Sequence, residues 1–180
     1  MPGADRLRDL RLPTKIVAVR LALLGRSPFA AEVFVADAPR RPGGHLLDDL
    51  AAQLAAAAAF IAVRWAERVR LLGTHAISWI AVRRPGADDA PLSDAAGDDL
   101  AFYDRQHRVE VELLEGGPLI GTLLDSAPAD RPRVIDHLNH AGLFLRLWTP
   151  AEHYLINTRQ IVAVSELSEV AGAALPAEVS

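Results

Sequence analysis

Histidine is the side chain best suited to bind a metal or transfer a proton near neutral pH, and the sequence contains six of them. His137 and His140 lie three residues apart, so on one helical turn their rings could share a metal ion. The matching stretch of the first half carries Asp49 and Gln53 instead. We therefore interpret the pair as surface or capping residues, and we predict neither a metal site nor a cofactor.

Two aspartates, Asp48 and Asp136, occupy matching places in the two halves of the chain. A general base would need a nearby acid or nucleophile, and none is evident, so we expect both carboxylates to cap the following turn by accepting backbone N–H groups. Asn157 is expected to satisfy backbone groups at a tight connector in the same way. Walker, G-x-G-x-x-G, G-x-S-x-G and H-E-x-x-H motifs are missing from the sequence. We predict a protein without catalytic residues, which is not an enzyme.

Four further side chains are candidates for contact with RNA or with a protein partner. His75 and Arg159 each precede the last predicted strand of their half, at the position of a turn. Trp65 and Trp148 each end a strand that begins at a phenylalanine. An exposed tryptophan is a stacking platform or a protein-binding anchor. We favour the alternative, that both close the core or an interface.

Composition limits the class of protein. The 180 residues are 51% hydrophobic and carry a formal net charge of −4, which predicts a globular chain and argues against a surface that grips nucleic acid throughout. The absence of cysteine excludes disulfides, thiolate metal sites and thiol catalysis. The N-terminal stretch lacks the apolar core of a secretory signal, and the run from Leu54 to Val63 is shorter than a membrane span. We predict a cytoplasmic protein.

The same succession of features occurs twice along the chain, which predicts an internal duplication. The alternative is one larger mixed domain whose halves resemble each other by accident. The aligned residues are Val17, Val19 and Leu21 with Val109, Val111 and Leu113; Gly25 and Pro28 with Gly117 and Pro118; Asp48 and Leu50 with Asp136 and Leu138; Phe60 with Phe144; and Leu71, Thr74 and Ile77 with Leu155, Thr158 and Ile161.

Each half has the pattern of five short strands. In the second half, Val109 to Leu113 alternates apolar and acidic residues, a glycine–proline turn follows, and Gly121 marks a bend within the partner strand. Leu46 to Phe60 is Ala-rich with leucines at helical spacing, which predicts a helix of about three turns. Val134 to Asn139 is expected to form a single turn. We predict a mainly β protein with one helix in the first half and two tandem five-stranded small barrels.

The predicted modules cover residues 14–83, which include the helical insertion, and 102–168. Residues 84–101 are rich in Pro, Gly, Ala and Asp and are predicted to be an acidic flexible linker, and residues 169–180 a loose tail.

Two segments resemble known small-barrel proteins. The stretch VEVELLEGGPLIGTL, which begins at Val109, resembles the first motif of the Sm-like family, a strand, a Gly turn and a second strand with a bending Gly. Thr74-His75-Ala76-Ile77-Ser78 is similar to the second motif of the Hfq-type Sm-like RNA chaperones, with Thr74 where that motif has lysine. The whole pattern also resembles tandem SH3-like bacterial small barrels. The resemblance implies barrel topology and RNA contact, in which His75 would meet a base or a phosphate.

The leading hypothesis is a non-enzymatic binding or scaffolding protein that meets a protein partner or forms a homo-oligomer. One alternative is an Sm-like RNA-binding regulator, which salt-dependent RNA binding through His75 and Arg159 would support. Another is a ligand or nucleotide sensor with a pocket between the modules, which a ligand-induced melting shift would support.

Overall fold

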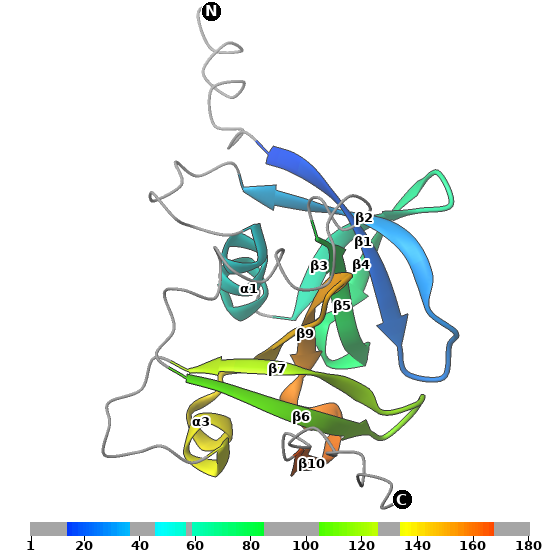
Figure 1. The fold of residues 1–180 in the computed structure, drawn as a ribbon. Helices are drawn as coiled ribbons and strands as arrows, with labels where there is room; N and C mark the ends of the chain where they lie inside the picture. The colour runs from blue at the N-terminus through cyan, green and yellow to red at the C-terminus, as the bar shows by residue number, and fades with distance from the viewer. Residues whose placement is uncertain (1–13, 37–45, 57–58, 85–104, 126–133, 168–180) are drawn as a thin grey trace, which may run out of the picture.

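The computed structural model describes residues 14–36, 46–56, 59–84, 105–125 and 134–167. In this part of the chain ten antiparallel strands form one sheet, accompanied by two α-helices and two 3-10 turns (Figure 1). The strands are β1 (Thr14–Leu23), β2 (Phe29–Ala36), β3 (Phe60–Trp65), β4 (Arg68–Gly73), β5 (Ile77–Arg83), β6 (Arg105–Leu113), β7 (Leu119–Asp125), β8 (Phe144–Trp148), β9 (Glu152–Asn157) and β10 (Ile161–Glu166); the helices are α1 (Leu46–Ala56) and α3 (Val134–His140), and the turns are η1 (Thr74–Ala76) and η2 (Thr158–Gln160).

The order of strands across the sheet is β10-β6-β7-β8-β9-β5-β1-β2-β3-β4. Each half therefore contributes its fifth, first, second, third and fourth strand in that order. The structure corrects the expectation of two closed barrels. In a closed barrel β5 would pair with β4 of its own half, but β5 pairs with β9 of the other half, so the sheet stays open. Among the described strands, β4 and β10 form its two ends.

The strand registers correct one part of the sequence alignment. Leu21 pairs with Phe29 in the first hairpin, and Val111 pairs with Leu119 in the second, so Leu21 corresponds to Val111 rather than to Leu113. Because a shift of two residues keeps each side chain on the same face, the apolar faces expected of these strands are still the buried ones. In the β3–β4 and β8–β9 hairpins, Phe60 corresponds to Phe144, as the alignment has it.

The connections around the 3-10 turns also correspond between the halves. In each half, the last carbonyl of the 3-10 turn accepts a hydrogen bond from a backbone N–H in the first hairpin of that half. The threonine that begins the turn donates its N–H to the carbonyl of the residue before the third strand of that half. The four bonds are Leu24 N to Ala76 O (3.0 Å), Leu114 N to Gln160 O (2.9 Å), Thr74 N to Ala59 O (2.9 Å) and Thr158 N to Leu143 O (3.0 Å).

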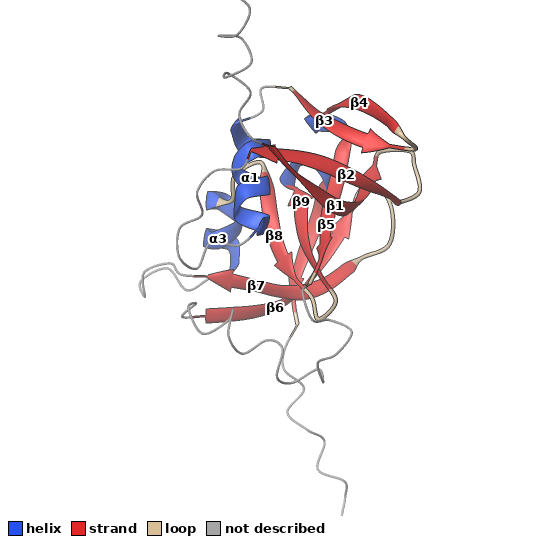
Figure 2. Cartoon of the chain, turned by 90° about the horizontal axis from the view of Figure 1, so that it is seen from above, coloured by secondary structure: helices blue, strands red, loops and turns tan. Residues whose placement is uncertain are grey.

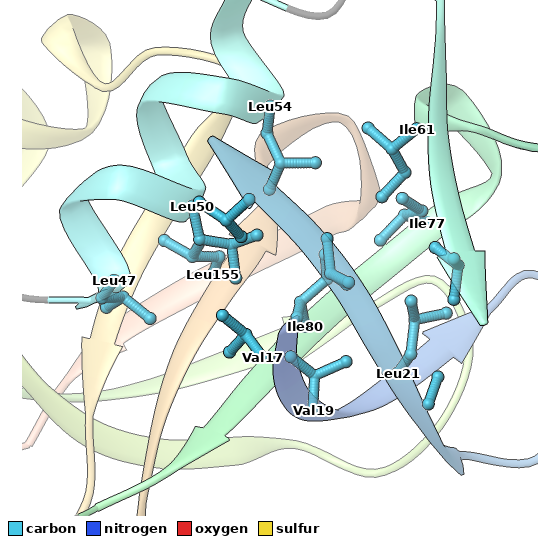
Figure 3. Close-up of a cluster of buried hydrophobic side chains, with 14 residues drawn as sticks. Val17, Val19, Leu21, Leu47, Leu50, Leu54, Ile61, Ile77, Ile80 and Leu155 are labelled. Carbon is cyan, nitrogen blue, oxygen red and sulfur yellow. The ribbon is translucent and has the colours of Figure 1, made fainter. Parts of the chain in front are cut away.

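Helix α1 is present where the first half was expected to contain a helix. Its leucines Leu47, Leu50 and Leu54 are buried in a core formed mainly by β1, β2, β3 and β5 (Figure 3). Two side chains fasten the helix to the sheet. Lys15 Nζ donates to Asp49 Oδ2 at 2.5 Å, and Gln53 Nε2 donates to the Phe34 carbonyl at 2.6 Å.

The second half also contains a helix, which corrects the expectation of one helix and a single turn. Helix α3 spans seven residues because the partly buried Val134, Leu138 and the following Ala141 pack on a second apolar core and give it one apolar side. Both helices lie on the same side of the molecule (Figures 1 and 2). Neither helix of the described residues has the length and apolar character needed to cross a membrane.

Gly121, which was expected to mark a bend, lies where β7 passes close to β8. A Cβ at Gly121 would lie 2.6 Å from the carbonyl oxygen of Trp148 and 2.7 Å from Leu147 Cγ. Only a residue without a side chain lets β7 approach β8 here.

Candidate interaction surface

The two halves meet where β5 pairs with β9, a junction that we call the seam. Five residue pairs form it, and the residues of both strands are mostly buried. The pairs are Trp79 with Ile156, Ile80 with Leu155, Ala81 with Tyr154, Val82 with His153, and Arg83 with Glu152.

On one face of the seam, the second half completes the core of the first. Leu155 of β9 is 0% exposed and lies among the α1 leucines and Ile80 (Figure 3). Phe144 of β8 packs against the same core. Because the other members of this core come from residues 17–82, these two side chains are what the second half supplies to it.

The other face of the seam carries a polar network. Arg20 Nη1 lies 3.0 Å from Glu152 Oε2, and the Tyr154 hydroxyl donates to the same carboxylate at 2.6 Å. The Tyr154 ring packs edge-on against Trp79, with 5.3 Å between ring centroids. Burial raises the pKa of Tyr154 to about 12, and the Glu152 carboxylate adds to the shift. The phenol is therefore a hydrogen-bond donor at neutral pH rather than a base.

A buried amide closes one end of the seam. Asn157 is 0% exposed, and its Nδ2 donates to the carbonyls of Ile77 (2.9 Å) and Thr74 (3.4 Å) in the first half. Its Oδ1 accepts the backbone N–H of Arg159 at 3.1 Å, which is a capping contact on η2. This one side chain thus joins the two 3-10 turns.

Strands β4 and β10 lie at the two ends of the sheet and correspond to β9 and β5 of the seam, but their side chains are largely exposed. We call β4 and β10 the outer edges. Leu71 of β4 is 71% exposed and corresponds to the buried Leu155. Phe60, which corresponds to Phe144, is 61% exposed. Val162 of β10 is exposed as well, so both outer edges present apolar side chains to solvent.

A groove runs along the β10 edge, between that strand and α3. Ile135, which lines it, is 60% exposed, whereas Leu47, at the corresponding place on α1, is 2% exposed. The groove is therefore an apolar surface open to solvent. Its lining comprises Val134, Ile135, Leu138, Ile161, Val162, Ala163, Val164 and Glu166.

The structure brings together only some of the residues suggested by the sequence. His75 and Arg159 are both exposed and occupy the middle positions of η1 and η2, the turns that Asn157 joins. Trp148 is buried and packs edge-on against His153 at 4.1 Å between ring centroids.

Trp65 lies instead in the outer hairpin formed by β3 and β4. It is partly buried, and its ring stacks on Phe29 with 4.1 Å between centroids. The guanidinium carbon of Arg70 lies 4.5 Å from the ring centroid, a cation–π contact. The two tryptophans therefore do not form one site.

The aspartates and the histidine pair are helical. Asp48 and Asp136 are the third residues of α1 and α3, and in the first turn of α3 the negative charge of Asp136 is favourable to the helix dipole. His140 Nδ1 lies 2.6 Å from the carbonyl oxygen of Asp136. Within the described residues no group of three or more His, Asp or Glu side chains is arranged to hold a metal ion.

Sequence reasoning missed the residues that distinguish the seam from the outer edges. Leu71 and Leu155 are the same residue type in the same pattern, so periodicity alone assigns them the same burial. No sequence signal separates them, because periodicity determines which face of a strand is buried and not which strand lacks a partner. Comparison with protein-family models, with curated proteins and with solved structures found no match.

Proposed function

We propose that the protein is a non-enzymatic scaffold, built from two duplicated five-stranded halves joined in one open sheet, which binds protein chains by adding their strands to its outer edges. The duplication is supported by the shared strand order and by the corresponding hydrogen bonds at η1 and η2. The lack of cysteine suits a reducing compartment, so we propose that it acts in the cytoplasm.

One observation carries the proposal. The outer edges expose apolar side chains at the positions that are buried in the seam, with Leu71 at 71% against Leu155 at 0%. An exposed edge strand presents a row of backbone N–H and C=O groups to which another chain can add. Backbone pairing supplies affinity in this mode of recognition, and pockets for alternate side chains supply specificity. The groove beside β10 is such a pocket.

Strand peptides test this function on the full chain. A peptide with the sequence of residues 67–74 is expected to bind and to slow amide hydrogen exchange in β10. A peptide with the sequence of residues 160–167 is expected to do the same in β4. Scrambled peptides of the same composition are the controls. Failure of both native-sequence peptides to bind would overturn the proposal, and so would a catalytic activity abolished by a single substitution.

A second function, RNA binding, is favoured by the exposure of His75 and Arg159 on joined 3-10 turns. Phosphate contacts by basic side chains make such binding weaken as salt rises. The expected result is an RNA mobility shift at low salt that is lost in the His75→Ala, Arg159→Ala double variant. The absence of any shift at low salt would remove this candidate.

A further inference from the structure

We infer that the chain occupying the outer edges is a second copy of this protein, with β4 of one copy added to β10 of the next in the register of the seam. The inference rests on the proposed function and names its partner. Transferring the β5–β9 pairing to the corresponding strands sets Leu72 opposite Ala163, Leu71 opposite Val164, and Val69 opposite Glu166.

The first support is the fit of apolar side chains. In the seam, Leu155 fills the space between β5 and α1. At the outer edge the corresponding space is the groove between β10 and α3, which is open. The corresponding side chain, Leu71, is exposed at the other end of the same molecule. The chain therefore carries both a projecting leucine and an open groove, but on opposite edges.

The burial of two further residues supports the same contact. Phe144 packs on the first core across the seam, and its counterpart Phe60 is exposed beside β4. Leu47 is covered on α1, and its counterpart Ile135 is exposed on α3. Strand addition between copies would bring Phe60 and Leu71 of one copy to the Ile135 groove of the next.

The seam contains an ion pair, and the corresponding residues at the outer edges carry the opposite charges. In the seam, Arg20 of β1 pairs with Glu152 of β9 at 3.0 Å. The residue corresponding to Arg20 is Glu110 of β6, and the residue corresponding to Glu152 is Arg68 of β4. Both signs are exchanged, so attraction would be kept where β4 of one copy meets β10 and β6 of the next. The exchange also disfavours the addition of β9 to β10, because Glu152 would then lie beside Glu110.

This contact joins two different surfaces, so it is heterologous. Heterologous contacts produce closed rings or open filaments rather than two-fold dimers. An isologous dimer through β4 alone or β10 alone would leave either the leucine or the groove without its counterpart. The two alternatives differ in how edge variants behave when they are mixed.

Mass photometry and sedimentation velocity on the full chain test the inference. The wild-type chain is expected to assemble as concentration rises. Leu71→Glu on the β4 edge and Ile135→Glu in the groove each change an exposed side chain, so both variants should fold with wild-type circular dichroism but remain monomeric. The matched control is Ile120→Glu, since Ile120 is an exposed apolar residue of β7, which lies inside the sheet. It should assemble as the wild type does.

Mixing the two edge variants gives the decisive result. Each retains one intact edge, so an equimolar mixture is expected to form dimers containing one of each and nothing larger. Glu110→Arg or Arg68→Glu alone should weaken assembly about tenfold, and the double variant should restore it. A wild-type chain that stays monomeric while the strand peptides still bind overturns this inference and leaves the proposed function standing. Dimers formed by one edge variant alone indicate an isologous contact and also overturn it.

Discussion

The seam and the outer edges are built from corresponding strands in opposite environments. At the seam, β5 and β9 pair, and Leu155 lies among the leucines of α1. At the outer edges, β4 and β10 each have one neighbour among the described strands, and Leu71 projects into solvent. The difference teaches that burial here is decided by the supply of a partner strand and not by the local sequence pattern.

The two junctions also differ in their polar contacts. Asn157 binds carbonyls of the other half at the seam, whereas the residue at its corresponding place on β4 is Gly73, which has no side chain to do so. The covalent connection between the halves and this amide make the seam a permanent junction. A junction between copies would lack both, so we expect it to form reversibly with concentration.

The largest expected effect separates the two leucines. Leu155→Ala should lower the free energy of unfolding by about 3 kcal/mol, because it leaves a cavity in a fully buried site. Leu71→Ala should change it by less than about 0.5 kcal/mol, because that side chain is exposed in the single copy. Urea unfolding at a concentration where the chain is monomeric measures both values. An equal loss of unfolding free energy in the two variants would contradict the difference between the seam and the outer edges.

The next effect concerns the amide at the seam. Asn157→Ala should cost about 2 kcal/mol of unfolding free energy, because it leaves buried carbonyls without a donor. Asn139→Ala, at an exposed position of α3, is the matched control and should cost no more than about 0.5 kcal/mol. If both asparagines prove equally dispensable in thermal denaturation, Asn157 does not hold the halves together.

A pH dependence should come from the polar face of the seam. The pKa of Tyr154 is about 12 in the folded chain, above the usual value of 10.0. The folded state thus holds this proton more tightly, so its contribution to stability is complete below about pH 10 and is lost as pH rises toward 12. Chemical denaturation across this range should show a steeper loss for the wild type than for Tyr154→Phe. If the unfolding free energies of the two proteins fall in parallel as pH rises, the Tyr154 phenol is solvated in the folded chain.

The smallest effect lies in the hairpin that carries β4. Ala66 and Glu67 connect β3 to β4 with positive φ angles of 48° and 58°, a conformation that favours glycine. Glu67→Gly should therefore stabilise the chain by about 0.5 kcal/mol. The melting temperature should rise slightly while assembly is unchanged, since the turn keeps its shape. A lower melting temperature would show that the Glu67 side chain makes a contact worth more than the strain.

Much of the secondary structure could be predicted from residue patterns, and the pairing between halves could not. The alternation from Val109 to Leu113 predicts a strand and its buried face, and the leucines after Leu46 predict α1. The pairing of β5 with β9 could not be predicted in this way. Periodicity determines which face of a strand is buried but not which distant strand lies beside it, so closed barrels and a continuous sheet share one pattern.

Less of the candidate surface was predictable, and the contacts expected of His75 and Arg159 stay predictions. The residue types expected to make contacts, His75 and Arg159, are exposed on corresponding turns. Leu71 was recognised as part of the repeat but not as a contact residue, because apolar side chains in strands are ordinarily core. Its exposure follows only from its place on the last strand of an open sheet.

Amide hydrogen exchange as a function of protein concentration tests most directly whether the seam and the outer edges are the same junction, made once within the chain and once between chains. Amides of β5 and β9 are expected to be protected at every concentration. Amides of β4 and β10 are expected to become protected together as concentration rises, and to lose that protection in Leu71→Glu. Rapid exchange in β4 and β10 at all concentrations, with no difference between the wild type and the variant, would contradict the account.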